Sequence, residues 1–265
     1  LAVPCQNQRG ALEAARTLLR PETVIVNAAK GIELDTLKPL SVVTREALGG
    51  TEEDVRCRYA MLSGPSFAAE VVRDQPTAVV LATAEEVLGC RLRELFSCAT
   101  FRCYSSTDVL GVELGGALKN VIALAAGIAD GLGYGDNTKA ALITRGIAEI
   151  ARLGIAMGGK SETFYGLTGI GDLIVTCASV HSRNRKAGYL IGQGRTMEEA
   201  MDEVKMIVEG VYSAKAALAL SKKYGIEMPI VEQVNKVLFE GKRADEAVNE
   251  LMMRDPKIEN GGLTW

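Results

Sequence analysis

An apolar, helix-length segment at residues 111–131 (GVELGGALKNVIALAAGIADG) limits what this chain can fold into more than any other feature. In a helix, its side chains leave almost no polar face. The apolar positions in and beside the segment are Leu110, Leu114, Ala117, Leu118, Val121, Ile122, Ala125, Ile128 and Ala129. A helix that is apolar nearly all round lies in a protein interior. The segment therefore predicts one long buried helix.

A single lysine, Lys119, lies in the middle of this segment. An unpaired ammonium in an apolar interior is strongly destabilising, and burial lowers a lysine pKa toward the range useful for proton transfer. Two structural alternatives are that Lys119 extends to the surface or pairs with Glu113. Asn120 beside it, and the pair Gly115-Gly116 one turn earlier, favour a functional role because small residues allow a close approach to the helix.

Composition excludes several classes of protein. The 265 residues are enough for two domains, and the net charge of −3 with mixed signs argues against nucleic-acid binding. Charges or glycines interrupt every apolar run, so no membrane span is expected. Six cysteines without a CxxC pair, and one histidine, predict no metal site and a reducing compartment such as the cytoplasm.

Two halves of the chain differ in their patterns. Residues 1–106 alternate apolar, β-branched runs (1–4, 23–27, 59–63, 77–81 and 101–104) with helical stretches (10–19, 36–48 and 84–97). Residues 107–265 are dominated by helical patterns at 109–130, 138–157, 184–193, 196–205, 212–224, 228–240 and 243–253. The first pattern is typical of a largely parallel sheet. The chain is therefore predicted to form an α/β domain followed by an all-α domain.

Two loops of the first half contain candidate binding residues. Lys30 follows the strand at 23–27, and ligands of open parallel sheets bind beyond the carboxyl ends of the strands. A solvent-exposed loop lysine is the alternative there. In MLSGPSFAAEV (61–71), Gly64-Pro65 predicts a turn, and Ser66 is predicted to cap a helix with Ala68 in its first turn. Such a helix start can bind an anion.

The second half contains the segment TGIGDLIVTCASVHSRNRKAG (168–188). Asp172 has apolar neighbours and needs a cationic or hydroxyl partner. Ser182 is predicted to cap a helix with basic residues in its first turn, among them Arg183. Cations there oppose the helix dipole unless an anion such as phosphate offsets them, although a surface basic patch is the alternative. No GxGxxG dinucleotide motif occurs in the chain.

Together these segments resemble the NAD(P)-dependent glycerol-3-phosphate dehydrogenases of the bacterial and plastid type. The motifs that carry the resemblance are AAKGIE, SGPSFAAEV, GVELGGALKN, GLTGIGDLIVTC, SRNRKAG and IVEG, in this order along nearly the whole chain. The resemblance implies a partial Rossmann-like domain over 1–106, without the family's opening GxGxxG half. A helical domain for substrate binding and dimerisation follows over 107–265.

The resemblance also implies roles for individual residues. Lys119 matches the catalytic proton donor and acceptor. The matches to substrate-contacting positions are Lys30, Gly64, Ser66, Lys119, Asn120, Asp172, Thr176, Ser182, Arg183 and Asn184. The matches to cofactor-contacting positions are Lys30, Ala68, Arg183, Ile207 and Glu209.

The implied reaction is the reduction of dihydroxyacetone phosphate to sn-glycerol 3-phosphate by NADH or NADPH, in a cytoplasmic homodimer that supplies phospholipid synthesis. A plastid location remains open. Because the GxGxxG half is missing, we expect this chain by itself to be inactive. Two alternatives remain: a non-catalytic remnant, and a related two-domain dehydrogenase of hydroxy acids or ketopantoate.

Overall fold

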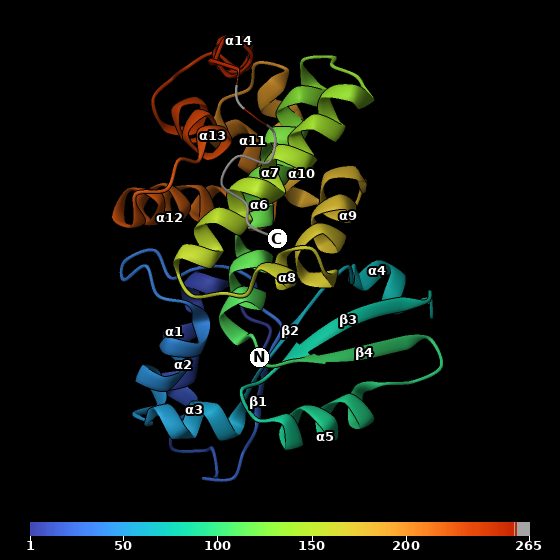
Figure 1. The fold of residues 1–265 in the computed structure, drawn as a ribbon, viewed down its shortest axis with the longest axis vertical. Helices are drawn as coiled ribbons and strands as arrows, with labels where there is room; N and C mark the ends of the chain where they lie inside the picture. Colours follow the sequence, from blue (N-terminus) through green and yellow to red (C-terminus); the bar gives the residue numbers. More distant parts are fainter. Residues whose placement is uncertain (257, 259–265) are drawn as a thin grey trace.

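The computed structural model describes residues 1–256 and 258. Figure 1 shows the strands and the early helices at one end of the molecule, and the later helices gathered at the other. The long helix α6 (Val109–Gly131) begins near the sheet and extends into the helical region. This arrangement confirms the predicted α/β region followed by an all-helical region.

The sheet has four strands in the order β1 (Ile25–Asn27), β2 (Tyr59–Ser63), β3 (Thr77–Ala82) and β4 (Phe101–Ser106). β1 pairs parallel to β2 and β3 parallel to β4, whereas β2 and β3 are antiparallel. The sheet is therefore mostly parallel, as predicted, with one reversal. The reversal arises because the link from β2 to β3 contains only the single-turn helix α4 (Ala68–Val71), while the parallel links contain full crossover helices.

The helices of the sheet region agree with the sequence pattern except at two places. They are α1 (Gln8–Ala15), α2 (Leu40–Leu48), α3 (Glu52–Arg58) and α5 (Glu86–Phe96). Helix α3 was not predicted, although Thr51 and Asp54 form a capping box that marks its start. The strand predicted at residues 1–4 is wrong. Leu1 exchanges backbone hydrogen bonds with Val26 and Ala28, but a 3₁₀ turn (Cys5–Asn7) follows Pro4 and ends the extended run.

The helical region contains every helix predicted from residue 107 onward, and no strand among its described residues. The predicted helices are α6, α7 (Asp136–Ala156), α10 (Arg183–Gly192), α11 (Met197–Val204), α12 (Glu209–Tyr224), α13 (Pro229–Phe239) and α14 (Ala244–Met252). Three further turns were not predicted: α8 (Ser161–Phe164), the π-helical η2 (Leu167–Gly171) and α9 (Asp172–Ala178). The two glycines in TGIGD are typical of a loop sequence, but in the structure they allow neighbouring helices to pack closely.

Helix α6 forms the centre of the main hydrophobic core, with nearly all its residues buried. By length and composition it could cross a membrane, contrary to the expectation that no apolar run was long enough. However, 89% of its apolar window is buried inside the protein, as in a core helix. Its burial makes the environment of Lys119 a protein interior.

Candidate active site

Lys119 is buried, with only 5% of its surface exposed. Its Nζ atom lies 2.8 Å from Thr176 Oγ1, 3.2 Å from Asn120 Oδ1 and 3.2 Å from Asp172 Oδ1. An ammonium has three N–H donors, so these three acceptors satisfy it. The two structural alternatives are wrong: Lys119 neither reaches the surface nor pairs with Glu113.

Lys30 completes a cluster of three charged groups. It lies in the loop after β1, and its Nζ donates to Asp172 Oδ2 at 2.5 Å and to the Gly64 carbonyl at 3.1 Å. Asp172, the first residue of α9, therefore binds Lys30 with one carboxylate oxygen and Lys119 with the other. The sheet region and the helical region contribute one lysine each.

The pKa values of the cluster follow from burial and charge. Burial lowers the pKa of Lys119 to about 8; the Asp172 carboxylate opposes this shift and the Lys30 charge adds to it. Burial acts to raise the pKa of Asp172, but Lys119 and Lys30 together outweigh it and hold that pKa below its usual range. The site therefore keeps an ionised carboxylate beside an ammonium that can lose its proton near neutral pH.

The glycine pair before Lys119 allows close approach, as the sequence suggested. A Cβ atom on Gly116 would lie 3.0 Å from Ser63 Oγ and 3.4 Å from Lys30 Cγ. One on Gly115 would lie 3.3 Å from the Thr168 carbonyl oxygen. Thr168 also donates to Ser63 Oγ at 2.7 Å. The Lys30 stem and the η2 turn thus pack directly on the backbone of α6.

A second set of side chains extends the site along α6 toward α10 and α12. Asn184 Nδ2 donates to Asn120 Oδ1 at 3.0 Å, and Asn184 Oδ1 accepts the Gly210 N–H at 2.8 Å. Ser182 caps α10 through the Arg185 N–H, as predicted. The structure thus joins Asn184 to the Lys119 cluster through Asn120, with Ser182 two residues before it.

The basic residues of α10 differ in their availability. Arg185 is occupied, because it forms an ion pair with Asp130 at 2.7 Å. Arg183 is exposed and, within the described residues, forms no ion pair with a carboxylate. It therefore remains able to bind an anionic ligand.

The segment after β2 places Gly64 but not Ser66 as predicted. Gly64 has φ +129°, a conformation that favours glycine, and its carbonyl accepts from Lys30. The predicted capping role of Ser66 is wrong: Phe67 is the residue that directly precedes α4, and Ser66 Oγ donates to the Gly64 carbonyl at 3.1 Å. Ala68 is exposed at the start of α4.

Glu209 lies at the start of α12, beside the loop that carries Lys30. Its Oε1 accepts the Cys5 N–H at 3.2 Å, whereas its buried Oε2 has no hydrogen-bond partner. A Cβ atom on Gly31 would lie 3.6 Å from that oxygen. Burial raises the pKa of Glu209, and the nearby Arg183 charge partly offsets the shift. Ile207, two residues earlier, is partly exposed. An unpartnered buried acceptor is suited to a ligand that donates N–H groups.

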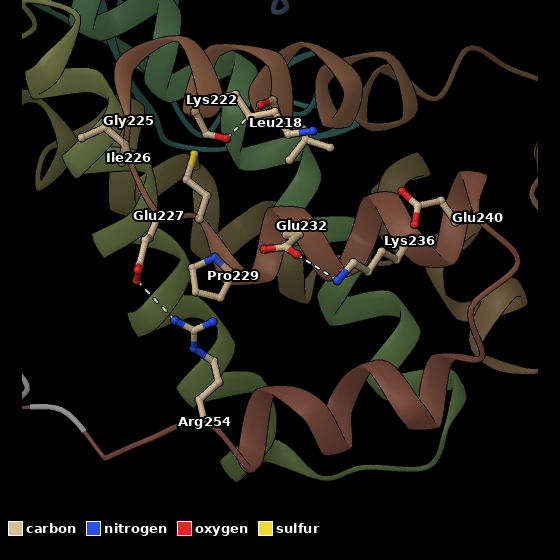
Figure 2. A pocket seen from close by; sticks show the side chains of 12 residues that line it. Leu218, Lys222, Gly225, Ile226, Glu227, Pro229, Glu232, Lys236, Glu240 and Arg254 are labelled. Atoms are coloured by element: carbon tan, nitrogen blue, oxygen red, sulfur yellow. Dashed lines mark hydrogen bonds and ion pairs between the residues drawn. The ribbon is translucent and has the colours of Figure 1, made fainter.

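Two cavities lie away from this cluster. Figure 2 shows one of about 450 Å³ between the end of α12, α13 and Arg254, where the ion pairs Glu232–Lys236 and Glu227–Arg254 lie at its wall. The other, about 160 Å³, is lined by the segment after α1, by α2 and α3, and by the first residues of β1 and β2. Neither contains a predicted site residue. Among the described residues, no group of three His, Cys, Asp or Glu side chains is placed to hold a metal.

Comparisons with known proteins agree with this arrangement. The family description "NAD-dependent glycerol-3-phosphate dehydrogenase N-terminus" matches residues 1–88, from the first residue on, and the corresponding C-terminus matches 108–249. A glycerol-3-phosphate dehydrogenase [NAD(P)+] of Fusobacterium nucleatum is 58% identical over 259 residues, which are 98% of this chain and 76% of that protein. One of Agathobacter rectalis is 59% identical over 266 residues, 100% of this chain and 77% of that protein.

A solved structure supports the same relationship. The 2.1 Å crystal structure of glycerol-3-phosphate dehydrogenase from Coxiella burnetii matches with a TM-score of 0.89 and 39% identity, over 96% of this chain and 76% of that one. The motifs, the fold and the buried lysine cluster lead to one conclusion. The chain belongs to the NAD-dependent glycerol-3-phosphate dehydrogenase family.

Proposed function

We propose that this chain is an oxidoreductase that interconverts dihydroxyacetone phosphate and sn-glycerol 3-phosphate with NAD or NADP. The observation that carries the proposal is the buried Lys119 ammonium, held by Asp172 and flanked by Lys30. Close relatives named for this reaction support it. The product is a precursor of glycerophospholipids.

Lys119 is the proton donor and acceptor. In the reducing direction the ketone carbon gains a hydride, and negative charge develops on the ketone oxygen. Lys119 transfers a proton to that oxygen, and in the reverse direction its neutral amine accepts the proton from the alcohol. The positive charge of Lys30 stabilises the oxyanion, while Asp172 and Thr176 hold Nζ in place.

The residues present fit a nicotinamide cofactor, which when bound supplies or accepts the hydride. The unpartnered Oε2 of Glu209 is suited to accept an N–H of the nicotinamide carboxamide. Lys30, Ala68, Arg183 and Ile207 are the further cofactor contacts that the family resemblance implies.

The substrate phosphate is bound at the start of α10. Arg183 offers a bidentate guanidinium there, and the capped helix start adds a positive dipole end. Asn184, Gly64 and Ser66 are further substrate contacts that the family resemblance implies. Binding energy from the phosphate positions the reacting carbon next to Lys119.

The organisation we propose is a dinucleotide-binding region over 1–106 and a substrate-binding and dimerisation region over 107–265. Residues 257 and 259–265 of the second region lie outside the described residues. We further propose a cytoplasmic homodimer, as the family resemblance implies.

The proposal is tested by following NADH and NADPH oxidation by the intact enzyme with dihydroxyacetone phosphate, and with unphosphorylated dihydroxyacetone as the matched substrate. Turnover should need the phosphate. Equal turnover of both substrates, or turnover of ketopantoate or a hydroxy acid instead, would favour the related dehydrogenases. No turnover of any of them would favour a non-catalytic protein.

A further inference from the structure

A second buried carboxylate lies on the same helix as Lys119, less than two turns earlier. Glu113 is 2% exposed, and both of its oxygens are occupied. Oε1 accepts the Ser41 N–H and the Tyr59 hydroxyl, each at 2.7 Å, and Oε2 accepts the Ser41 hydroxyl at 2.7 Å. The Glu113 carboxylate on α6 thus forms hydrogen bonds with both the start of α2 and the first residue of β2.

The hydrogen bonds continue from Tyr59 to the loop that carries Lys30. Asn27, the last residue of β1, donates from Nδ2 to the Tyr59 hydroxyl at 3.0 Å. Asn27 Oδ1 accepts the N–H of Ala29 at 3.0 Å, and Ala29 directly precedes Lys30. Asn27 and Tyr59 are both buried. The path therefore begins on α6 and ends at the backbone next to Lys30.

The loop that contains Lys30 also contacts α6 further along that helix. The Lys30 stem packs on Gly116, and its Nζ binds Asp172, which also binds Lys119. Contacts from Glu113 to Lys30 and from Lys30 to Lys119 thus form a closed ring around residues 113–119 of α6. Any shift of the loop backbone changes the distance between the two lysines.

We propose that Glu113 is a positioning residue which, through Tyr59 and Asn27, holds the Lys30 loop so that its ammonium lies on Asp172 beside Lys119. The inference rests on the proposed function, because Lys119 is the proton-transfer group whose surroundings Glu113 fixes. It assigns Glu113, Tyr59 and Asn27 a role in the reaction without substrate contact.

A comparison within the molecule shows what a carboxylate with only a capping role looks like. Glu149 on α7 is also buried, and its two oxygens accept the Ile230 and Val231 N–H groups at the start of α13. Those bonds end on the backbone of α13. Glu113 caps α2 in a similar way, but it also accepts from the Tyr59 hydroxyl, and that branch leads to the Lys30 loop.

The experiment compares Glu113→Gln and Tyr59→Phe with the matched control Glu149→Gln in the intact enzyme. Each variant is assayed for kcat, KM and the pH dependence of kcat/KM in glycerol 3-phosphate oxidation, with thermal unfolding measured in parallel. Both test variants should lower kcat by about 10–100-fold, since small misplacements of catalytic groups have effects of that size. Their pH profiles should also move to higher pH, because Lys119 loses the nearby Lys30 charge. Glu149→Gln should change only the unfolding temperature.

The result that overturns the inference is a wild-type pH profile, with kcat within about threefold of wild type, in folded Glu113→Gln. If that variant does not fold, Tyr59→Phe decides by the same criterion, because it retains the Ser41 bonds of Glu113. An equal profile shift in Glu149→Gln would also overturn it. Failure of the proposed function is distinguishable, because the wild-type enzyme would then not turn over glycerol 3-phosphate at all.

Discussion

At the scale of single residues, the pKa of Lys119 depends on its burial and on groups from two neighbouring parts of the fold. Asp172 and Cys177 on α9 act to raise its pKa, whereas burial and Lys30, in the loop after β1, lower it. The balance leaves the pKa at about 8. Burial dominates the sum, so the amine can be neutral at a pH where an exposed lysine is fully charged.

This balance predicts opposite pH dependences for the two directions of the reaction. Oxidation of glycerol 3-phosphate needs the neutral amine, so kcat/KM should rise with pH and level off above about 8. Reduction of dihydroxyacetone phosphate needs the ammonium, so kcat/KM should fall above the same pH. Initial rates measured in both directions across this range check the prediction.

Asp172→Asn is a control for which the direction of the shift in the Lys119 pKa can be predicted. Because the carboxylate raises the pKa of Lys119, its removal should move both midpoints to lower pH. Profiles that change in the same direction for oxidation and reduction, or midpoints that do not respond to Asp172→Asn, would contradict the assignment of Lys119.

At the scale of elements, two helices are held together by facing glycines. A Cβ atom on Gly188 of α10 would lie 2.2 Å from the Leu124 carbonyl oxygen of α6, and one on Gly127 of α6 would lie 2.1 Å from the Arg185 carbonyl oxygen. The backbones therefore touch, and α10 carries Ser182, Arg183 and Asn184 against α6. Close packing of this helix pair sets the position of the proposed phosphate site.

Gly188→Ala should consequently lower both stability and substrate affinity. Overpacking a tight contact typically costs about 1–3 kcal/mol, which lowers the unfolding temperature by roughly 2–4 °C per kcal/mol in a protein of this size. The KM for dihydroxyacetone phosphate should rise because Asn184 moves away from Asn120. Thermal unfolding and steady-state kinetics provide the measurements.

Gly10→Ala is the matched control, since Gly10 lies in α1 and a Cβ atom there would meet nothing within 4 Å. It should leave KM unchanged and stabilise the protein by up to about 1 kcal/mol through helix propensity. If Gly188→Ala were as stable as wild type and bound substrate equally well, the helices would not be in backbone contact.

At the scale of the whole molecule, the sequence predicted what composition and periodicity determine. Helix α6 and strand β2 were predicted because their apolar patterns are unambiguous. The reversal between β2 and β3 was not, because strand direction depends on how the chain returns and not on local residues. The turns from α8 to α9 were missed because their glycines serve packing contacts that only the folded chain contains.

The candidate site likewise contains residues that could be predicted from the sequence and residues that could not. Lys119 and Asp172 could each be predicted to need a polar partner, because each is a charge in an apolar setting, whereas their pairing with one another is seen only in the fold. Asn27, Tyr59 and Glu113 could not be predicted as a group, because nothing local links them along the chain. Ala68 and Ile207 rest on family resemblance alone and stay predictions.

Lys119→Ala in the intact enzyme tests whether Lys119 performs the proton transfer. We expect turnover of dihydroxyacetone phosphate to fall by about 10²–10⁴-fold, the usual effect of losing a general acid, with cofactor affinity nearly unchanged. Lys236→Ala, which removes a lysine of the ion pair with Glu232 on α13, should behave as wild type. Turnover of Lys119→Ala within about threefold of wild type would show that another group performs the proton transfer.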